Sequence, residues 1–251
     1  MNTGNPVVLI TGALTGIGRA TALAFARQGA KLIISGRRAE EGKAFARELA
    51  LSGGEAKFVL TDVTDESQIE KLVGEAKSAF GRLDVAVNNA GVEGTPGPIT
   101  EVTVSNYQAV FDANVRGVLF SMKHELPLML QQGSGSIINI SSIVGHVGMP
   151  GASIYTASKH AVEGLTRAAA LEAAAGGVRV NAVAPGPIET AMLNRFTGHS
   201  AEMKAGLIGM MPAKRSGTVD EVAAAIVYLA SPGAAYVTGQ ILGIDGGYSA
   251  Q

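Results

Sequence analysis

The chain has 251 residues, of which 47% are hydrophobic and 16% are charged, and its formal net charge is −1. A charge this close to zero offers no electrostatic basis for binding nucleic acid or an anionic membrane. With no cysteine, disulfides and thiolate-bound metals are excluded, and no apolar segment approaches the length of a membrane helix. We therefore expect one compact domain over residues 1–251, located in the cytoplasm because the N-terminus has no signal-peptide pattern.

Short apolar runs alternate with helical patterns along the chain, which predicts repeated βα units. The expected strands are Val7–Ile10, Lys31–Ser35, Ala56–Leu60, Leu83–Val87, Ser136–Ile140, Val178–Ala184 and Ile241–Ile244. The expected helices lie near Gly16–Gln28, Ala39–Leu51, Glu66–Phe80, Ser105–Gln131, Ser153–Ala174 and Val219–Ala230. Asp65, followed three residues later by Gln68, predicts a capping box at the third helix. The pattern predicts an α/β fold: a Rossmann-type, doubly wound parallel sheet of seven strands with helices on both faces.

The first strand leads into the turn Thr11-Gly12-Ala13-Leu14-Thr15-Gly16-Ile17-Gly18, which is followed by a helical pattern. Unsatisfied N–H groups and the positive dipole end of a helix N-terminus attract a phosphate, and glycines let the backbone approach it. The G-x-x-x-G-x-G spacing differs from the G-x-G-x-x-G of the standard dinucleotide fingerprint. Its position between a strand and a helix nevertheless predicts a pyrophosphate site.

Tyr155 and Lys159 are four residues apart in a predicted helix, so they share one face. A lysine ammonium beside a phenol favours the phenolate and lowers the phenol's pKa by about 1–3 units. That shift brings the pKa toward physiological pH, where acid–base catalysis works best. Ser142, at the end of a predicted strand, could polarise the same substrate oxygen. Taken alone, Tyr155 and Lys159 would be an ordinary exposed helical pair, but the three groups together suit proton transfer at a carbonyl or alcohol.

These motifs, in this order, resemble the short-chain dehydrogenase/reductase family over nearly the whole chain. The resemblance is carried by Thr11-Gly12-x-x-x-Gly16-Ile17-Gly18, Asp62-Val63, Asn88-Asn89-Ala90-Gly91, Asn114, Ser142, Tyr155-x-x-x-Lys159, Pro185-Gly186-x-Ile188-x-Thr190 and Asp245-Gly246-Gly247. It implies an NAD(P)-dependent oxidoreductase that transfers a hydride between a nicotinamide cofactor and a ketone or secondary alcohol. It also implies a homotetramer or homodimer paired through the two long helices, which are rich in alanine (Ala168, Ala169, Ala170, Ala173, Ala174 and Ala175).

The resemblance also implies a role for each site residue. Tyr155 would be the general acid and base, Lys159 would lower its pKa and hold the nicotinamide ribose, and Ser142 would bind the substrate oxygen. Ser142, rather than Ser141, matches the family's separation from the tyrosine, and Asn114 would hold a water that relays protons. The implied cofactor contacts are Gly12, Leu14, Thr15, Gly16, Ile17, Gly18, Asp62, Val63, Asn89, Ala90, Gly91, Tyr155, Lys159, Pro185, Ile188 and Thr190. Asp62 could instead be a turn residue after the third strand.

The end of the second strand, Ser35-Gly36-Arg37-Arg38, bears on the choice of cofactor. NAD-specific enzymes usually carry an acid here that binds the ribose 2′-OH, whereas an arginine suits a 2′-phosphate. Gly36 at the acid's position, followed by Arg37 and Arg38, favours NADP. NAD remains the alternative, because Thr15 stands where many NADP-dependent members have a basic residue. Either arginine could also stack on the adenine or lie in solvent.

The segment 191–214 has no clear period and contains several glycines, which predicts a mobile substrate lid; a fixed pair of surface helices is the alternative. The expected pocket walls include Glu93 and are otherwise mostly apolar, which favours a small hydrophobic ketone or alcohol. Reduction of 3-oxoacyl groups on acyl carrier protein and oxidation of sugars or polyols remain alternatives. Gly133 and Gly176 occupy positions where the family's carrier-protein reductases have basic docking residues.

No metal is expected, because the histidines (His124, His146, His160 and His199) are isolated from one another. A non-catalytic NAD(P)-binding sensor would keep the same fold. Such proteins usually lose the tyrosine or the lysine, and this chain retains both Tyr155 and Lys159.

Overall fold

All seven strands of the sheet are parallel, in the order β3-β2-β1-β4-β5-β6-β7, in a computed structural model that describes residues 5–250. The strands are β1 (Val7–Ile10), β2 (Lys31–Gly36), β3 (Glu55–Leu60), β4 (Val85–Asn88), β5 (Gly135–Ile140), β6 (Val178–Pro185) and β7 (Ile241–Ile244). This topology confirms the predicted doubly wound α/β fold. Residues 1–4 and 251 of the expected domain lie outside the described residues.

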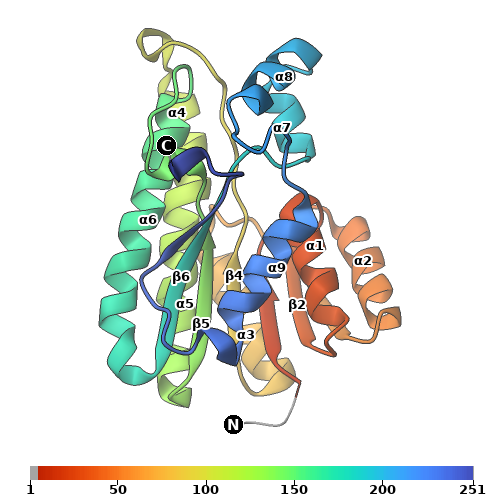
Figure 1. Cartoon of the computed structure of the whole chain (residues 1–251). Helices are drawn as coiled ribbons and strands as arrows, with labels where there is room; N and C mark the ends of the chain where they lie inside the picture. The colour runs from red at the N-terminus through yellow and green to blue at the C-terminus, as the bar shows by residue number, and fades with distance from the viewer. Residues whose placement is uncertain (1–4, 251) are drawn as a thin grey trace.

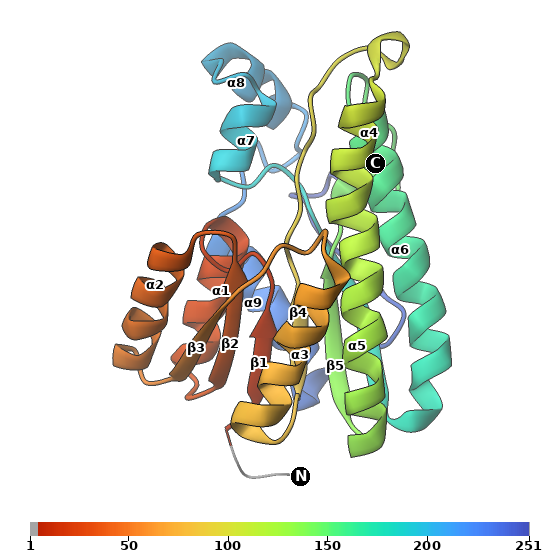
Figure 2. The same cartoon turned by 180° about the vertical axis from the view of Figure 1, so that it is seen from behind.

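Two layers of helices cover the sheet, one on each face (Figures 1 and 2). The helices are α1 (Gly16–Ala26), α2 (Ala39–Leu51), α3 (Glu66–Phe80), α4 (Val104–Phe111), α5 (Gly117–Gln132), α6 (Ser153–Ala173), α7 (Ala191–Phe196), α8 (Ala201–Gly209) and α9 (Val219–Ala230). Because side chains alternate along a strand, Val8 and Ile10 pack with α1, α2 and α9, whereas Val7 and Leu9 pack with α3, α5 and α6. A strand buried on both faces explains the continuous apolar run in β1.

The expected long helix Ser105–Gln131 is divided into three parts. Between α4 and α5, the segment Asp112–Arg116 is π-helical. A π-segment widens one turn of an α-helix and is frequently found at functional sites. Asn114 lies within it, and its side chain bonds to backbone outside the helix instead of facing solvent.

Two local predictions differ from the structure. The Asp65 side chain does cap α3 through the Ser67 N–H, but the Gln68 carbonyl accepts from the Asp62 N–H, so there is no reciprocal capping box. The strand expected at Leu83–Val87 begins at Val85, because the Leu83 N–H donates to the Gln132 side chain rather than to the sheet. In the first case the Gln68 side chain bonds a backbone N–H three residues before the expected one, and in the second the Gln132 side chain takes the place of a strand partner.

The helices α7 and α8 lie beyond the carboxyl ends of the strands, opposite the loop that leads into α4 (Figures 1 and 2). In a parallel α/β sheet, this edge is where ligands bind. The predicted lid segment therefore contains two short helices above that edge. None of the helices within residues 5–250 is both long enough and apolar enough to span a bilayer.

Candidate active site

The glycine-rich turn after β1 brings backbone and a helix N-terminus together at the carboxyl edge of the sheet. Gly12 has φ 63°, and a side chain there would place its Cβ 2.9 Å from the Cα of Ala90. At Gly18, a Cβ would lie 2.5 Å from Nδ2 of Asn89. Thr15 is the N-cap of α1, yet within the described chain its side chain makes no capping hydrogen bond and the first turn has no acidic residue. The N–H groups of this turn therefore remain available to a pyrophosphate, and the predicted residues fit a dinucleotide.

Asn89 and Ala90 stabilise this turn. Nδ2 of Asn89 donates to the carbonyls of Thr11 and Gly12 at 3.0 and 2.9 Å, and the Thr11 hydroxyl accepts from both backbone N–H groups, of Asn89 and of Ala90. The Asn89 side chain therefore acts on the shape of the glycine turn. The resemblance had implied only that Asn89 contacts the cofactor.

The loop after β6 meets the turn from the other side. Pro185 ends β6, and Ile188 pairs with Gly217 in an isolated parallel bridge. The Thr190 methyl lies 3.4 Å from where a Cβ on Gly16 would be, and the Thr190 hydroxyl caps α7. These predicted contacts therefore lie together, next to the start of α7.

The expected cofactor contacts Arg37, Arg38, Asp62 and Val63 lie just after the ends of β2 and β3. Arg37 is exposed, while Nε of Arg38 pairs with Glu41 at 2.8 Å. A Cβ on Gly36 would lie 2.8 Å from Cδ1 of Leu14, so Leu14 occupies the space in which an acidic side chain would begin.

Asp62 forms a local turn after β3, the role considered above as the alternative to cofactor binding. Its Oδ1 accepts from the backbone N–H and the hydroxyl of Thr64 at 3.0 and 2.9 Å. Val63 packs against Gly117 at the start of α5, where a Cβ would lie 3.1 Å from Cγ2 of Val63. One carboxylate oxygen of Asp62 is therefore engaged in local structure.

Lys159 is directed at the end of β5. Its Nζ donates to the Ile140 carbonyl at 2.7 Å and lies 5.5 Å from the centre of the Tyr155 ring. The residue is only 6% exposed, and burial lowers the pKa of Lys159 to about 8. The two side chains share one face of α6, as their spacing predicted.

The expected lowering of the Tyr155 pKa is wrong for this arrangement. The pKa of Tyr155 is raised to about 12: burial raises it most, Ser142 opposes this by hydrogen bonding to the phenol, and the negative charge of Glu93 adds to the increase. The reason is that the loss of hydration outweighs any help from a lysine that is bound to a backbone carbonyl. At neutral pH the phenol is therefore a proton donor.

The two neighbouring serines point in different directions, as an extended backbone requires. Ser142 lowers the pKa of the neighbouring Tyr155 phenol, and it begins a short 3₁₀ turn, Ile143–Gly145, whose Val144 N–H donates to its hydroxyl at 3.4 Å. Ser141 instead donates to Oε1 of Glu163 at 2.9 Å, on the buried side. The geometry favours Ser142 as the serine that faces the substrate oxygen.

Asn114 reaches the site from the π-helical segment. Its Oδ1 accepts from the Val92 N–H at 2.8 Å, and its Nδ2 donates to the Val92 carbonyl and to the Ser158 hydroxyl at 2.9 and 3.1 Å. A Cβ on Gly91 would lie 2.9 Å from Asn114 Oδ1 and 3.9 Å from Lys159 Nζ. Asn114 thus holds the strand-end loop close to the lysine, and its water-holding role stays a prediction.

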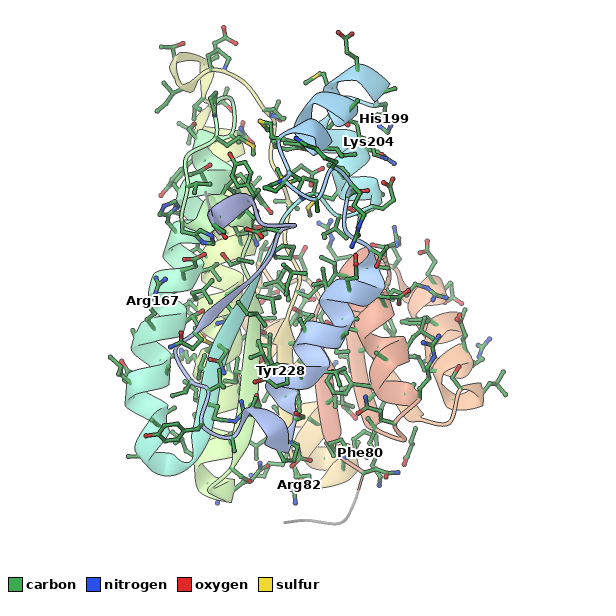
Figure 3. All side chains as sticks on the ribbon, in the orientation of Figure 1. Phe80, Arg82, Arg167, His199, Lys204 and Tyr228 are labelled. Carbon is green, nitrogen blue, oxygen red and sulfur yellow. The ribbon has the colours of Figure 1, made fainter. Side chains whose placement is uncertain are left out.

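Sequence reasoning missed Glu163, which lies behind the serines. This buried carboxylate accepts from Ser141 and from Arg167 of α6, which is labelled in Figure 3, and contacts Nδ1 of His146 at 3.1 Å. The available signal was an acidic residue on the same helix face as Lys159, four residues further on. Its contacts fix the loop that carries Ser142.

The comparisons with known proteins agree with this geometry. A family model described as enoyl-(acyl carrier protein) reductase matches residues 12–249. Cis-4-hydroxycyclohexanecarboxylate dehydrogenase of Sinomonas cyclohexanicum is 43% identical, and the match covers 97% of this chain and 96% of that protein. Cyclohexanol dehydrogenase of Acinetobacter sp. (strain SE19) is 38% identical over 98% of this chain and 96% of its own. The solved structure of ElxO with NADP bound superposes with a TM-score of 0.92 at 38% identity, covering 99% of this chain and 100% of that chain.

These matches span the whole fold and include proteins named as dehydrogenases of ring alcohols. The glycine turn follows β1, Ser142 follows β5, and Tyr155 and Lys159 lie on α6 with Lys159 bonded to the end of β5. The chain therefore belongs to the short-chain dehydrogenase/reductase family, as an NAD(P)-dependent oxidoreductase of alcohol and carbonyl groups.

Proposed function

We propose that this protein interconverts small alicyclic secondary alcohols and ketones, with NADP as its cofactor. The observation that carries the proposal is the setting of Tyr155: its ring packs on an apolar cluster of Ile143, Val144 and Met211, and Ser142 lies near enough to lower the pKa of its phenol. An apolar wall beside a single proton donor suits a ring ketone. The names of two relatives, a cyclohexanol and a hydroxycyclohexanecarboxylate dehydrogenase, support the same substrate class.

In the proposed mechanism, the nicotinamide supplies or accepts the hydride when it is bound. Tyr155 gives its proton to the substrate oxygen during reduction and takes it back during oxidation. Ser142 donates a hydrogen bond to the same oxygen, where negative charge develops. Lys159 supplies a nearby positive charge, held in place by the Ile140 carbonyl. Asn114 keeps the loop after β4 against the lysine, so the acid and its neighbours stay in one geometry.

NADP is proposed on the chemistry at the end of β2. Arg37 is exposed beside the glycine turn, and Gly36 carries no acid that would repel a 2′-phosphate. NAD is the alternative cofactor, and Arg38 contributes less because Glu41 already pairs with it. The bound NADP in the structure of ElxO supports this choice.

We also propose that 191–214 is the substrate lid. His199 and Lys204, labelled in Figure 3, mark its position above the carboxyl edge of the sheet. Thr190, a proposed cofactor contact, is also the N-cap of α7, so cofactor binding and the start of the lid share a residue. Closure over the site would exclude water from hydride transfer.

A homotetramer, or a homodimer, is proposed through the outer face of α4, α5 and α6. Large apolar side chains are exposed there: Val104, Tyr107, Leu119, Leu130 and Leu171. Of the alanines expected to pair, Ala169, Ala170 and Ala173 are buried against the protein's own sheet, so they cannot contribute. Light scattering at micromolar concentration tests the assembly, and cell fractionation tests the proposed cytoplasmic location.

The function is tested by mixing the purified protein with NADPH or NADH and a panel of ketones, and following nicotinamide absorbance. We expect cyclohexanone-like ketones to be reduced faster with NADPH than open-chain sugars. Carrier-bound acyl groups are not part of the proposal, because Gly133 and Gly176 provide no basic side chain for docking. Binding of NADPH without turnover of any carbonyl would instead indicate a cofactor sensor.

A further inference from the structure

One charged group lies within the cleft beside Tyr155. Glu93, on the loop that follows β4, lines this cleft together with Tyr155 and Phe196, and its side chain is only 10% exposed. Arg195 of α7 binds it from the outer side, Nε to Oε1 at 2.6 Å and Nη2 to Oε2 at 3.2 Å. The Arg195 side chain is 54% exposed. Glu93 lines the cleft and Arg195 does not, so a substrate group that enters the cleft would contact the carboxylate and not the guanidinium.

The other polar side chains that line the cleft beside Tyr155 are uncharged: Thr95, Asn106 and Ser153. Among the residues of the described chain that line it, Glu93 is the one carboxylate. Asn106 also lines it, but its amide is occupied by the backbone of Thr95, at 2.9 Å through Oδ1 and 3.1 Å through Nδ2. Each carboxylate oxygen of Glu93 accepts one bond from Arg195, and a carboxylate oxygen can accept two.

The negative charge of Glu93 acts on the Tyr155 phenol, because it raises the pKa of that group. Glu93 and Tyr155 also line the same cleft, and the Glu93 side chain there is poorly hydrated, so that like charges repel strongly. When the reacting hydroxyl of an alicyclic substrate is bound at Tyr155, a second substituent on the substrate ring would lie near the Glu93 carboxylate. A hydroxyl can donate to Glu93, whereas a carboxylate would be repelled.

We infer that Glu93 is a specificity-determining residue that accepts a hydrogen bond from a second hydroxyl, so that alicyclic diols are preferred over hydroxy acids. The inference rests on the proposed function and narrows its substrate class. A hydrogen bond to a charged acceptor corresponds to about a ten- to hundredfold difference in kcat/KM. The preference should therefore be visible as a ratio of two substrates on one enzyme.

The test compares kcat/KM for cyclohexanol, for the cyclohexane-1,2-, 1,3- and 1,4-diols, and for 4-hydroxycyclohexanecarboxylate. In the parent, we expect the best diol to exceed cyclohexanol by about ten- to hundredfold and the hydroxy acid to be poorest. Glu93→Gln should lower the ratio of diol to cyclohexanol by about tenfold and raise the relative rate of the hydroxy acid. A ratio is used because damage to folding or cofactor binding changes both rates together.

Two further variants separate recognition from the tethering of α7. Arg195→Ala breaks the same ion pair but leaves the Glu93 acceptor, so the diol preference should persist. Glu189→Gln removes the ion pair between Glu189 and Lys204, a second tether of the 191–214 segment, and should also leave the ratio unchanged.

The outcomes distinguish this inference from the function on which it rests. If the ratio of kcat/KM for the diol to that for cyclohexanol is the same in the parent and in Glu93→Gln, the role of Glu93 is overturned. The same holds if Arg195→Ala lowers this ratio as much as Glu93→Gln does. Neither result would contradict the alcohol dehydrogenase activity itself. A hydroxy acid that outperforms every diol would also overturn it, and would assign recognition to Arg195. Turnover of none of these alcohols would refute the proposed function, and this inference with it.

Discussion

The buried carboxyl group of Glu125 should make the free energy of unfolding of this protein depend on pH. It lies on α5 with no exposed surface, and its Oε2 accepts from Nδ2 of Asn88 at 3.1 Å. Within the described chain, Glu125 Oε1 and Asn88 Oδ1 have no hydrogen-bond partner. A proton on the carboxyl would turn one of these acceptors into a donor. Burial accordingly raises the pKa of Glu125 to about 8, from an ordinary value of 4.5.

The sign follows from proton linkage. Between about pH 4.5 and 8 the folded protein holds a proton at Glu125 that the unfolded chain has lost. The contribution of Glu125 to stability is therefore fully present below the unfolded pKa and is lost as the pH rises through the folded pKa. One proton changes the free energy of unfolding by about 1.4 kcal/mol per pH unit, so the loss between pH 5 and pH 7 is about 2–3 kcal/mol.

Glu125→Gln removes this titration while keeping the shape and the oxygen that accepts from Asn88. The assay is urea unfolding followed by circular dichroism at pH 5, 6 and 7, at one fixed protein concentration because assembly would shift the midpoint. The free-energy difference between variant and parent should move in favour of the variant by about 2–3 kcal/mol from pH 5 to pH 7. Glu172→Gln, at an exposed position on α6, is the control. A difference that stays constant over this range would show that Glu125 is ionised in the folded protein and refute the reasoning.

Four further predictions concern the site. Tyr155→Phe should cut turnover by about 10²–10⁴ with cofactor binding retained, and Ser142→Ala should cost a similar order; turnover within threefold of the parent would remove the residue concerned from the mechanism. Ser141→Ala should lower the melting temperature but have only a mild effect on turnover, because the Ser141 hydroxyl is bonded to the buried Glu163 carboxylate. A larger loss of turnover in Ser141→Ala than in Ser142→Ala would contradict the assignment of the two serines. Arg37→Ala should weaken NADP binding by roughly ten- to several-hundredfold and leave NAD almost unchanged, measured as two dissociation constants; a parent that already prefers NAD would exclude this role. The segment 191–214 should be cut by protease in the free protein and protected by cofactor plus substrate, and equal cleavage rates would favour a fixed pair of helices.

The order of the elements was readable from local patterns. The apolar run in β1, the glycine turn and the four-residue spacing of Tyr155 and Lys159 each reflect a constraint that acts within a few residues. A strand buried on both faces must be apolar throughout, and residues four apart on a helix must share a face. For this reason the fold class, most boundaries and the residues that meet at the strand ends were predictable.

What the sequence could not determine were properties that depend on distant partners. The π-helical segment around Asn114 depends on the backbone of Val92, and the buried position of Glu163 depends on Ser141 and His146. The pKa of Tyr155 rises instead of falling because burial, an effect of the whole tertiary structure, outweighs the neighbour identified from spacing. Hydration and long-range charge act through space, so only the folded arrangement decides how each ionisable side chain behaves.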